Sequence, residues 1–258
     1  MMIENDTQLR CYIPNALVTV QGEQSLFDKL KMDLQLSEQW LTNLIGTVPD
    51  EFVAGKAIAN DAFMRAIPSL DLVLTPNGFG IVSNNTIAPA SKDRVDRLIA
   101  SLEHNRDFAL DHLLQTMLQQ PEWRETAHGR YFLSTLFRTP LSLPAELRKQ
   151  HALDVFQQTH AQLVLIETEL AEKFISREVY AKLRADIGNT DFADLVQPLQ
   201  AIELQLLNGK PLPYKQLIAL VDYIRKSELF PDWQNTETAR LYEPHVFDNS
   251  KQSGGYWW

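Results

Sequence analysis

Two pairs of glutamate and histidine have a spacing that metal or acid–base chemistry could use. Glu125 and His128 form a Glu-x-x-His motif, which builds a di-iron site when two copies and two further glutamates converge in a helical bundle. The chain has one copy, so we interpret it as a solvated pair near a chain break. His160 and Glu167 lie seven residues apart on the seam of an expected helix, where the carboxylate could hold a proton on the imidazole. Such residues more often edge a core and satisfy one another by hydrogen bonding.

The remaining reactive side chains indicate no chemistry. The carboxylates of Glu167, Glu169 and Glu172 are typical of a solvated helix face. Cys11 is flanked by Tyr12 and by an isoleucine, which favours a buried, structural thiol. Ten glycines in 258 residues nearly exclude a Gly-rich phosphate cradle, and the usual zinc, hydrolase and P-loop motifs are missing. We therefore expect no enzyme, no metal and no cofactor.

Composition excludes several classes of partner. A net charge of -9 argues against direct binding of nucleic acid, which needs clustered lysines and arginines. No apolar run approaches the roughly 18 residues of a membrane span, so we expect no membrane partner. The polar start MMIENDTQLR differs from a signal peptide, and a single cysteine fits a reducing compartment. We expect a cytoplasmic location.

The first quarter of the chain predicts an arm followed by helices. Leu9 to Val20 is rich in strand-forming residues but is interrupted by Pro14, which indicates an extended arm or edge strand. Ser25 to Ile45 has leucines at helical spacing, a capping pair at its start and Gly46 as a stop. In the next helix, from Pro49 to Ile67, small residues would let a neighbouring helix approach closely, and Pro68 would end it.

A β-hairpin is predicted near Asp71 to Asn84. Two β-rich runs, DLVLT and FGIVSN, are joined by Pro76-Asn77-Gly78, which contains the strongest short hairpin signal. An isolated hairpin is marginal in water, so this one must pack on the helices or pair with another strand, which could come from another subunit. The predicted interface residues in the hairpin and in the C-terminal aromatic tail are Leu72, Leu74, Phe79, Ile81, Tyr256, Trp257 and Trp258.

The rest of the chain predicts further helices. Ser91 is a plausible N-cap of a long helix, and Pro121 follows the end of that helix. The segment 121–150 mixes aromatic residues with prolines and is the candidate for a subdomain hinge. Later helices carry apolar stripes around Leu153 to Phe174, Leu195 to Leu206 and Leu217 to Ile224. The predicted fold is a mainly α, multi-helix bundle with one short β-hairpin and an extended N-terminal arm: a single domain over 1–258 whose tail is 245–258.

The stretch from Ala59 to Leu98, ANDAFMRAIPSLDLVLTPNGFGIVSNNTIAPASKDRVDRL, resembles an uncharacterised family encoded in prophages of gut bacteria, and so does the closing FDNSKQSGGYWW. LVLTPNGFGIVSN and APAS are the segments that carry the resemblance. Members of that family tend to lie among genes for virion assembly. The resemblance implies a virion structural protein, similar to a head–tail connector, and it transfers no catalytic residue.

From the resemblance and the residues together we expect a phage-derived assembly protein that acts by protein–protein contact. Its partners would be itself, as a homo-oligomer, and other virion proteins, and it would stay in the cytoplasm until it is assembled into a virion. One alternative is an enzyme with a cleft between helical halves that uses His160 with Glu167 or Glu125 with His128. Another is a helical adaptor protein.

Overall fold

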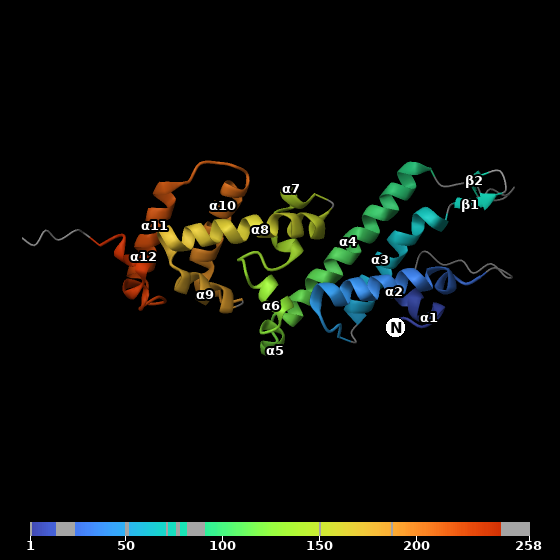
Figure 1. Ribbon diagram of the computed structural model, residues 1–258, viewed down its shortest axis with the longest axis horizontal. Helices are drawn as coiled ribbons and strands as arrows, with labels where there is room; N and C mark the ends of the chain where they lie inside the picture. Colours follow the sequence, from blue (N-terminus) through green and yellow to red (C-terminus); the bar gives the residue numbers. More distant parts are fainter. Residues whose placement is uncertain are drawn as a thin grey trace, which may run out of the picture. The chain divides into compact units, whose positions relative to one another are not determined.

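The computed structural model describes residues 2–13, 24–49, 52–70, 72–75, 78–81, 91–149, 151–186 and 188–243 (Figure 1). Over these residues the chain is mainly helical, which confirms the predicted fold class at that level. The chain divides into two compact units, unit 1 over Met1–Ala161 and unit 2 over Gln162–Trp258. None of the described helices is both long enough and apolar enough to cross a bilayer.

The elements of unit 1 in chain order are α1 (Asp6–Tyr12), α2 (Leu26–Ile45), α3 (Phe52–Leu70), β1 (Leu72–Thr75), β2 (Gly78–Ile81), α4 (Lys92–Met117), α5 (Pro121–Arg124), α6 (Ala127–Phe132), the 3-10 turn η1 (Pro140–Ser142) and α7 (Ala145–Arg148). The division between the units lies within α8 (Ala152–Leu170). The further elements of unit 2 are the π-helical turn η2 (Ala171–Ile175), α9 (Arg177–Ala185), η3 (Thr190–Phe192), α10 (Ala193–Leu207), α11 (Tyr214–Lys226), η4 (Trp233–Asn235) and α12 (Glu237–Arg240).

The structure begins with α1, Asp6–Tyr12, so the predicted extended arm is wrong over Leu9–Tyr12. α1 starts after Asn5, whose side chain accepts a hydrogen bond from the backbone N–H of Gln8. Leu9 in the middle of α1 is fully buried. The cap and this one buried anchor outweigh the strand preference of the neighbouring residues. The remainder of the predicted arm from residue 14 to residue 20 lies outside the described residues.

α3 packs against both α2 and α4 in unit 1 (Figure 1). The predicted ends of α2 are confirmed: the Ser25 side chain accepts a hydrogen bond from the N–H of Asp28, and Gly46 ends the helix with φ of 82°. The small residues of α3 have the predicted effect, because Ala54, Ala57, Ala59 and Ala62 are fully buried. A Cβ at Gly55 would lie 2.5 Å from the ring of Tyr12, so glycine there is what lets α1 approach.

Prolines and caps shape the ends of α3 and α4. Pro68 does not end α3 as predicted, because the helix continues to Leu70 with Pro68 in its last turn. A proline so close to the end costs a single backbone hydrogen bond, so the turn survives. Ser91 is the N-cap of α4 as predicted, although its side chain makes no capping hydrogen bond. Pro121 follows the end of α4 and begins α5.

β1 and β2 form an antiparallel, two-stranded sheet that follows α3 directly (Figure 1). The register pairs Leu72 with Ile81 and Leu74 with Phe79. Because successive strand positions alternate between the two faces, these four positions fall on one face of the sheet. The positions on the other face are Val73, Thr75, Gly78 and Gly80. The register therefore places two leucine positions, a phenylalanine position and an isoleucine position on one face, and the positions of a valine, a threonine and two glycines on the other.

The segment 121–150 belongs to unit 1 and is not where the chain divides. The Trp123 indole donates a hydrogen bond of 2.9 Å to the carbonyl of Ile45, and the N–H of Leu141 donates one of 3.0 Å to Asp111. Phe132 and Phe137 are almost fully buried. These anchors hold the proline-containing connector on α2 and α4, so the division falls further along the chain, in α8.

In unit 2, α8 ends in the π-helical turn η2. A π turn leaves carbonyl oxygens without their usual helical partners. Side chains from the C-terminal part of the unit satisfy three of these oxygens: Trp233 donates to Ile175, Thr238 to Ala171, and Tyr242 to Lys173. This pattern ties η4 and α12 to the end of α8.

The later helix signals are confirmed, while the tail cannot be compared. α10 runs through Pro198, and it ends at Asn208 and Gly209, where the glycine has φ of 71°. α11 begins directly after Pro213. The tail over 245–258, with its predicted interface residues Tyr256, Trp257 and Trp258, lies outside the described residues.

Candidate functional site

The largest group of interacting charges lies in unit 1 and is centred on Asp61 of α3. This carboxylate is 1% exposed. It accepts hydrogen bonds of 2.7 Å from the Ser37 hydroxyl of α2 and 2.6 Å from Nε of Arg65, and it lies 3.5 Å from Nη1 of Arg106 on α4. An Ala-rich helix thus carries a buried charge whose partners come from both helices that pack against it.

Arg106 joins this carboxylate to two others on α4. Its guanidinium is buried, and Nη2 lies 2.7 Å from Asp107 and 3.4 Å from Oε1 of Glu103. The guanidinium also lies over the ring of Trp40, 5.8 Å from the centroid. One cation therefore faces three buried carboxylates. We call Asp61, Arg65, Glu103, Arg106 and Asp107 the unit 1 ion network.

Burial and the neighbouring charges shift the pKa values of this network in opposite directions. Burial alone would lower the pKa of Arg106, but the carboxylates of Asp107, Asp61 and Glu103 outweigh it and the pKa is raised. Burial raises the pKa of Asp107, and the nearby charge of Arg106 limits that rise. Three carboxylates against two guanidiniums leave an excess of negative charge in this network.

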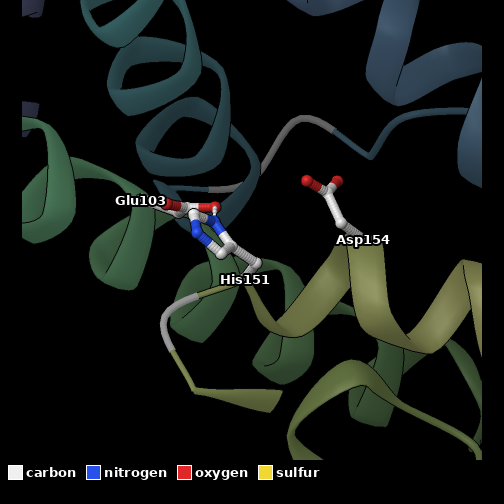
Figure 2. A group of neighbouring side chains, drawn as sticks. All are labelled: Glu103, His151 and Asp154. Atoms are coloured by element: carbon white, nitrogen blue, oxygen red, sulfur yellow. Dashed lines mark hydrogen bonds and ion pairs between the residues drawn. The ribbon is translucent and has the colours of Figure 1, made fainter.

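His151 and Asp154 stand at the exposed edge of the ion network (Figure 2). His151 precedes α8, and its Nδ1 lies 3.0 Å from Oε1 of Glu103. The hydrogen bond to Glu103 and the charge of that carboxylate raise the pKa of His151. Asp154 lies in the first turn of α8, and one ligand atom from each of the three residues lies within 4.8 Å of the other two. These three side chains are the ones in the described residues that could hold a metal ion together.

Unit 2 has a second buried charged group, formed by α8, α9 and α10. Glu167 is fully buried and is paired with Nη2 of Arg184 at 2.5 Å. Glu203 is also fully buried, and its Oε1 accepts a hydrogen bond of 3.1 Å from the hydroxyl of Tyr180. Its other oxygen, Oε2, has no hydrogen-bond partner among the described residues.

Burial favours the protonated form of Glu203. It raises the pKa of Glu203 well above the ordinary value, and the charge of Glu167 raises it further, while the Tyr180 hydrogen bond and Arg184 oppose the rise. Burial and the two glutamates likewise raise the pKa of Tyr180, so its phenol stays protonated and donates. Of the two glutamates, Glu167 is the one that forms an ion pair with Arg184.

His160 and Glu167 do not form the predicted pair. Nε2 of His160 lies 2.8 Å from the Ser134 hydroxyl, and its ring lies 4.0 Å from that of Tyr131, whereas Glu167 is paired with Arg184. Nδ1 of His160 has no hydrogen-bond partner in the described part of the chain. Burial lowers the pKa of His160, which favours a neutral imidazole packed among aromatic rings.

Most of the other residues that the sequence singled out belong to neither buried charged group. Glu125 is exposed and pairs with Arg130, so the structure does not place it with His128 as a site. Glu169 and Glu172 are solvated as predicted, each with a basic partner, whereas Glu167 is buried against that prediction. Cys11 is exposed, which corrects the predicted burial, because it lies on the solvent side of α1.

Residues 19–132 match the model of a family of unknown function, DUF6712. The matched segment covers α2, α3, the strands, α4, α5 and α6, and so it contains the whole unit 1 ion network. A search of curated proteins found no match to the chain, and a search of solved structures found none.

Sequence reasoning did not find the unit 1 ion network. Its charges lie in dense polar runs of α4 that look like a solvated face, and their partner Asp61 lies in another helix. One signal was available: Glu103, Arg106 and Asp107 alternate with Leu102 and Leu110 on the side of α4 that faces α3. Charges inside an apolar stripe indicate burial with a partner.

Proposed function

We propose that this chain is a structural component of a protein assembly and acts by contacts with copies of itself and with other proteins. The resemblance of residues 59–98 to a prophage family makes a phage virion the setting, with a head–tail connector-like role. In this proposal the protein is cytoplasmic until it joins the virion, and it performs no catalysis.

The observation that carries the proposal is the register of β1 and β2. It gathers the positions of Leu72, Leu74, Phe79 and Ile81 on one face of a sheet that has only two strands. Covering one such side chain is worth about 1.5–3 kcal/mol, and a lone hairpin is marginal in water. A partner that covers this face, or adds a strand to an edge, would supply stability that the hairpin lacks.

Exposed apolar side chains beside the strands support the same role. Leu70 at the end of α3 is 36% exposed and Leu98 near the start of α4 is 42% exposed. Single exposed leucines are ordinary on a protein surface. Here they lie on the helix ends that lead into and out of the segment containing the hairpin, so they would extend one contact surface.

The proposal is tested by the mass of the full chain in sedimentation velocity, over a range of concentrations. We expect a concentration-dependent oligomer, and we expect Leu74→Lys to prevent it by placing a charge on the apolar face. Val73→Lys is the matched control, because it puts the same charge on the neighbouring position of the opposite face. Val73→Lys should assemble as the unchanged chain does.

Two results would count against this function. One is a chain that stays strictly monomeric at every concentration and when mixed with the virion proteins encoded beside it. The other is an oligomer that both lysine variants form equally well, because the apolar face of the hairpin would then have no part in the assembly.

A further inference from the structure

Glu103, His151 and Asp154 bring the donor set of a transition-metal site to the edge of unit 1. Zn²⁺ binds histidine nitrogens and carboxylate oxygens, and a site with three protein ligands keeps a water in the fourth position. In a tetrahedral site with bonds of about 2.0 Å, the ligand atoms lie about 3.3 Å apart. Oε1 of Glu103 and Nδ1 of His151 are 3.0 Å apart, close to that spacing (Figure 2).

The third ligand needs only a small movement. Asp154 lies on the first turn of α8, within 4.8 Å of the other two ligand atoms, and it is exposed. An exposed carboxylate can change rotamer with little loss of packing. The site would therefore have one ligand fixed by burial, Glu103, and two ligands at the surface, where an ion can enter.

The charge around the site favours a divalent cation. Asp61, Glu103 and Asp107 are three carboxylates that share the guanidiniums of Arg65 and Arg106, and Asp154 adds a fourth carboxylate beside Glu103. Three of these carboxylates are buried, where uncompensated negative charge is costly. A divalent ion would balance the excess.

Arg106 does not block the proposed position of the metal ion beside Glu103. It lies 3.4 Å from Oε1 of Glu103 but only 2.7 Å from Asp107, so its closer partner is elsewhere. A carboxylate has acceptor positions on both oxygens and can contact an arginine and a metal ion together. We propose that Glu103, His151 and Asp154 bind one divalent transition-metal ion, with Zn²⁺ preferred over Mg²⁺ because of the imidazole ligand.

The test is a calorimetric titration of the metal-free full chain with ZnCl₂ and, separately, with MgCl₂. We expect saturable binding of one Zn²⁺ per chain and much weaker binding of Mg²⁺. His151→Asn and Asp154→Asn should each weaken Zn²⁺ binding by at least about tenfold. Both residues are exposed, so the variants should keep the fold, and circular dichroism checks that they do.

His112→Asn is the matched control, because His112 is another exposed histidine on α4 and lies away from the site. It should bind Zn²⁺ as the unchanged chain does. Absence of saturable Zn²⁺ binding up to millimolar concentrations would overturn the proposal. Binding that survives His151→Asn, or that falls equally in His112→Asn, would overturn it too, because the ion would then lie elsewhere.

Discussion

Both units bury carboxylates, but they compensate the charge differently. In unit 1 the guanidinium of Arg106 faces Asp61, Glu103 and Asp107, and the carboxylates lie in an ion network that reaches the surface at His151. In unit 2 Arg184 pairs with Glu167, while Glu203 has the hydroxyl of Tyr180. In both units burial raises the pKa of a carboxyl group, and the charge of Arg106 limits this rise for Asp107, whereas the charge of Glu167 adds to it for Glu203.

Removing the cation of unit 1 should have the largest effect. Arg106→Met leaves three buried carboxylates with only the half-exposed Arg65 beside Asp61 and the exposed His151 beside Glu103, so we expect the free energy of unfolding to fall by about 3–5 kcal/mol. Urea denaturation followed by circular dichroism measures the change. Arg97→Met, at an exposed position of the same helix, should change the stability by about 0.5 kcal/mol or less. A loss for Arg106→Met that is no larger than for Arg97→Met would contradict the comparison.

Replacing Glu203, the titratable acid of unit 2, should raise the free energy of unfolding at high pH, whereas Arg106→Met lowers it. The raised pKa of Glu203 means that the folded state holds its proton above 4.5, where the unfolded state releases it. Stability therefore falls as pH rises from about 4.5 to the folded pKa, by up to about 1.4 kcal/mol per pH unit. Glu203→Gln cannot lose a proton and keeps an acceptor for Tyr180.

The measurement is the difference in unfolding free energy between Glu203→Gln and the unchanged chain at a series of pH values. We expect the variant to be no more stable at pH 4 and to gain on the unchanged chain as pH rises. A difference that stays constant with pH would mean that Glu203 is ionised in the folded protein.

His160 should make the free energy of unfolding rise with pH, which is the reverse of the effect of Glu203, and the change should be smaller. Its lowered pKa means that the folded state resists the proton which the unfolded state takes up below 6.5. Stability contributed by the neutral ring is present above 6.5 and is lost as pH falls toward the folded pKa. His160→Gln should flatten this part of the pH profile, and thermal unfolding between pH 5 and 8 measures it. An unchanged slope in the variant would assign the acid sensitivity to another group.

The fold was predictable where a local signal decides an element. Ser25, Gly46 and Asn208 with Gly209 mark helix ends because capping depends on a few neighbouring residues. The extended arm was mispredicted because strand-forming residues near Pro14 outweighed the less conspicuous cap at Asn5. The division within α8 has no local signal, because it results from which residues pack together.

The charged groups were less predictable for the same reason. Glu167 lies in the apolar stripe of α8, which indicates burial, but its partner Arg184 lies on the next helix and has no spacing rule that identifies it. His151 and Glu103 are likewise joined only by the fold. By contrast, the two strands followed from two β-rich runs around an Asn-Gly turn, which is a local signal, and their register places Leu72, Leu74, Phe79 and Ile81 on one face. The interface role of these positions stays a prediction.

The most direct test of the assembly role is amide hydrogen exchange over residues 72–81, measured on the dilute chain and on the assembled protein. If a partner covers the apolar face or adds a strand, the marginal hairpin gains stability and its amides exchange more slowly in the assembly. The account predicts that this slowing is larger in 72–81 than in α8. Equal exchange of 72–81 in the two states would contradict it.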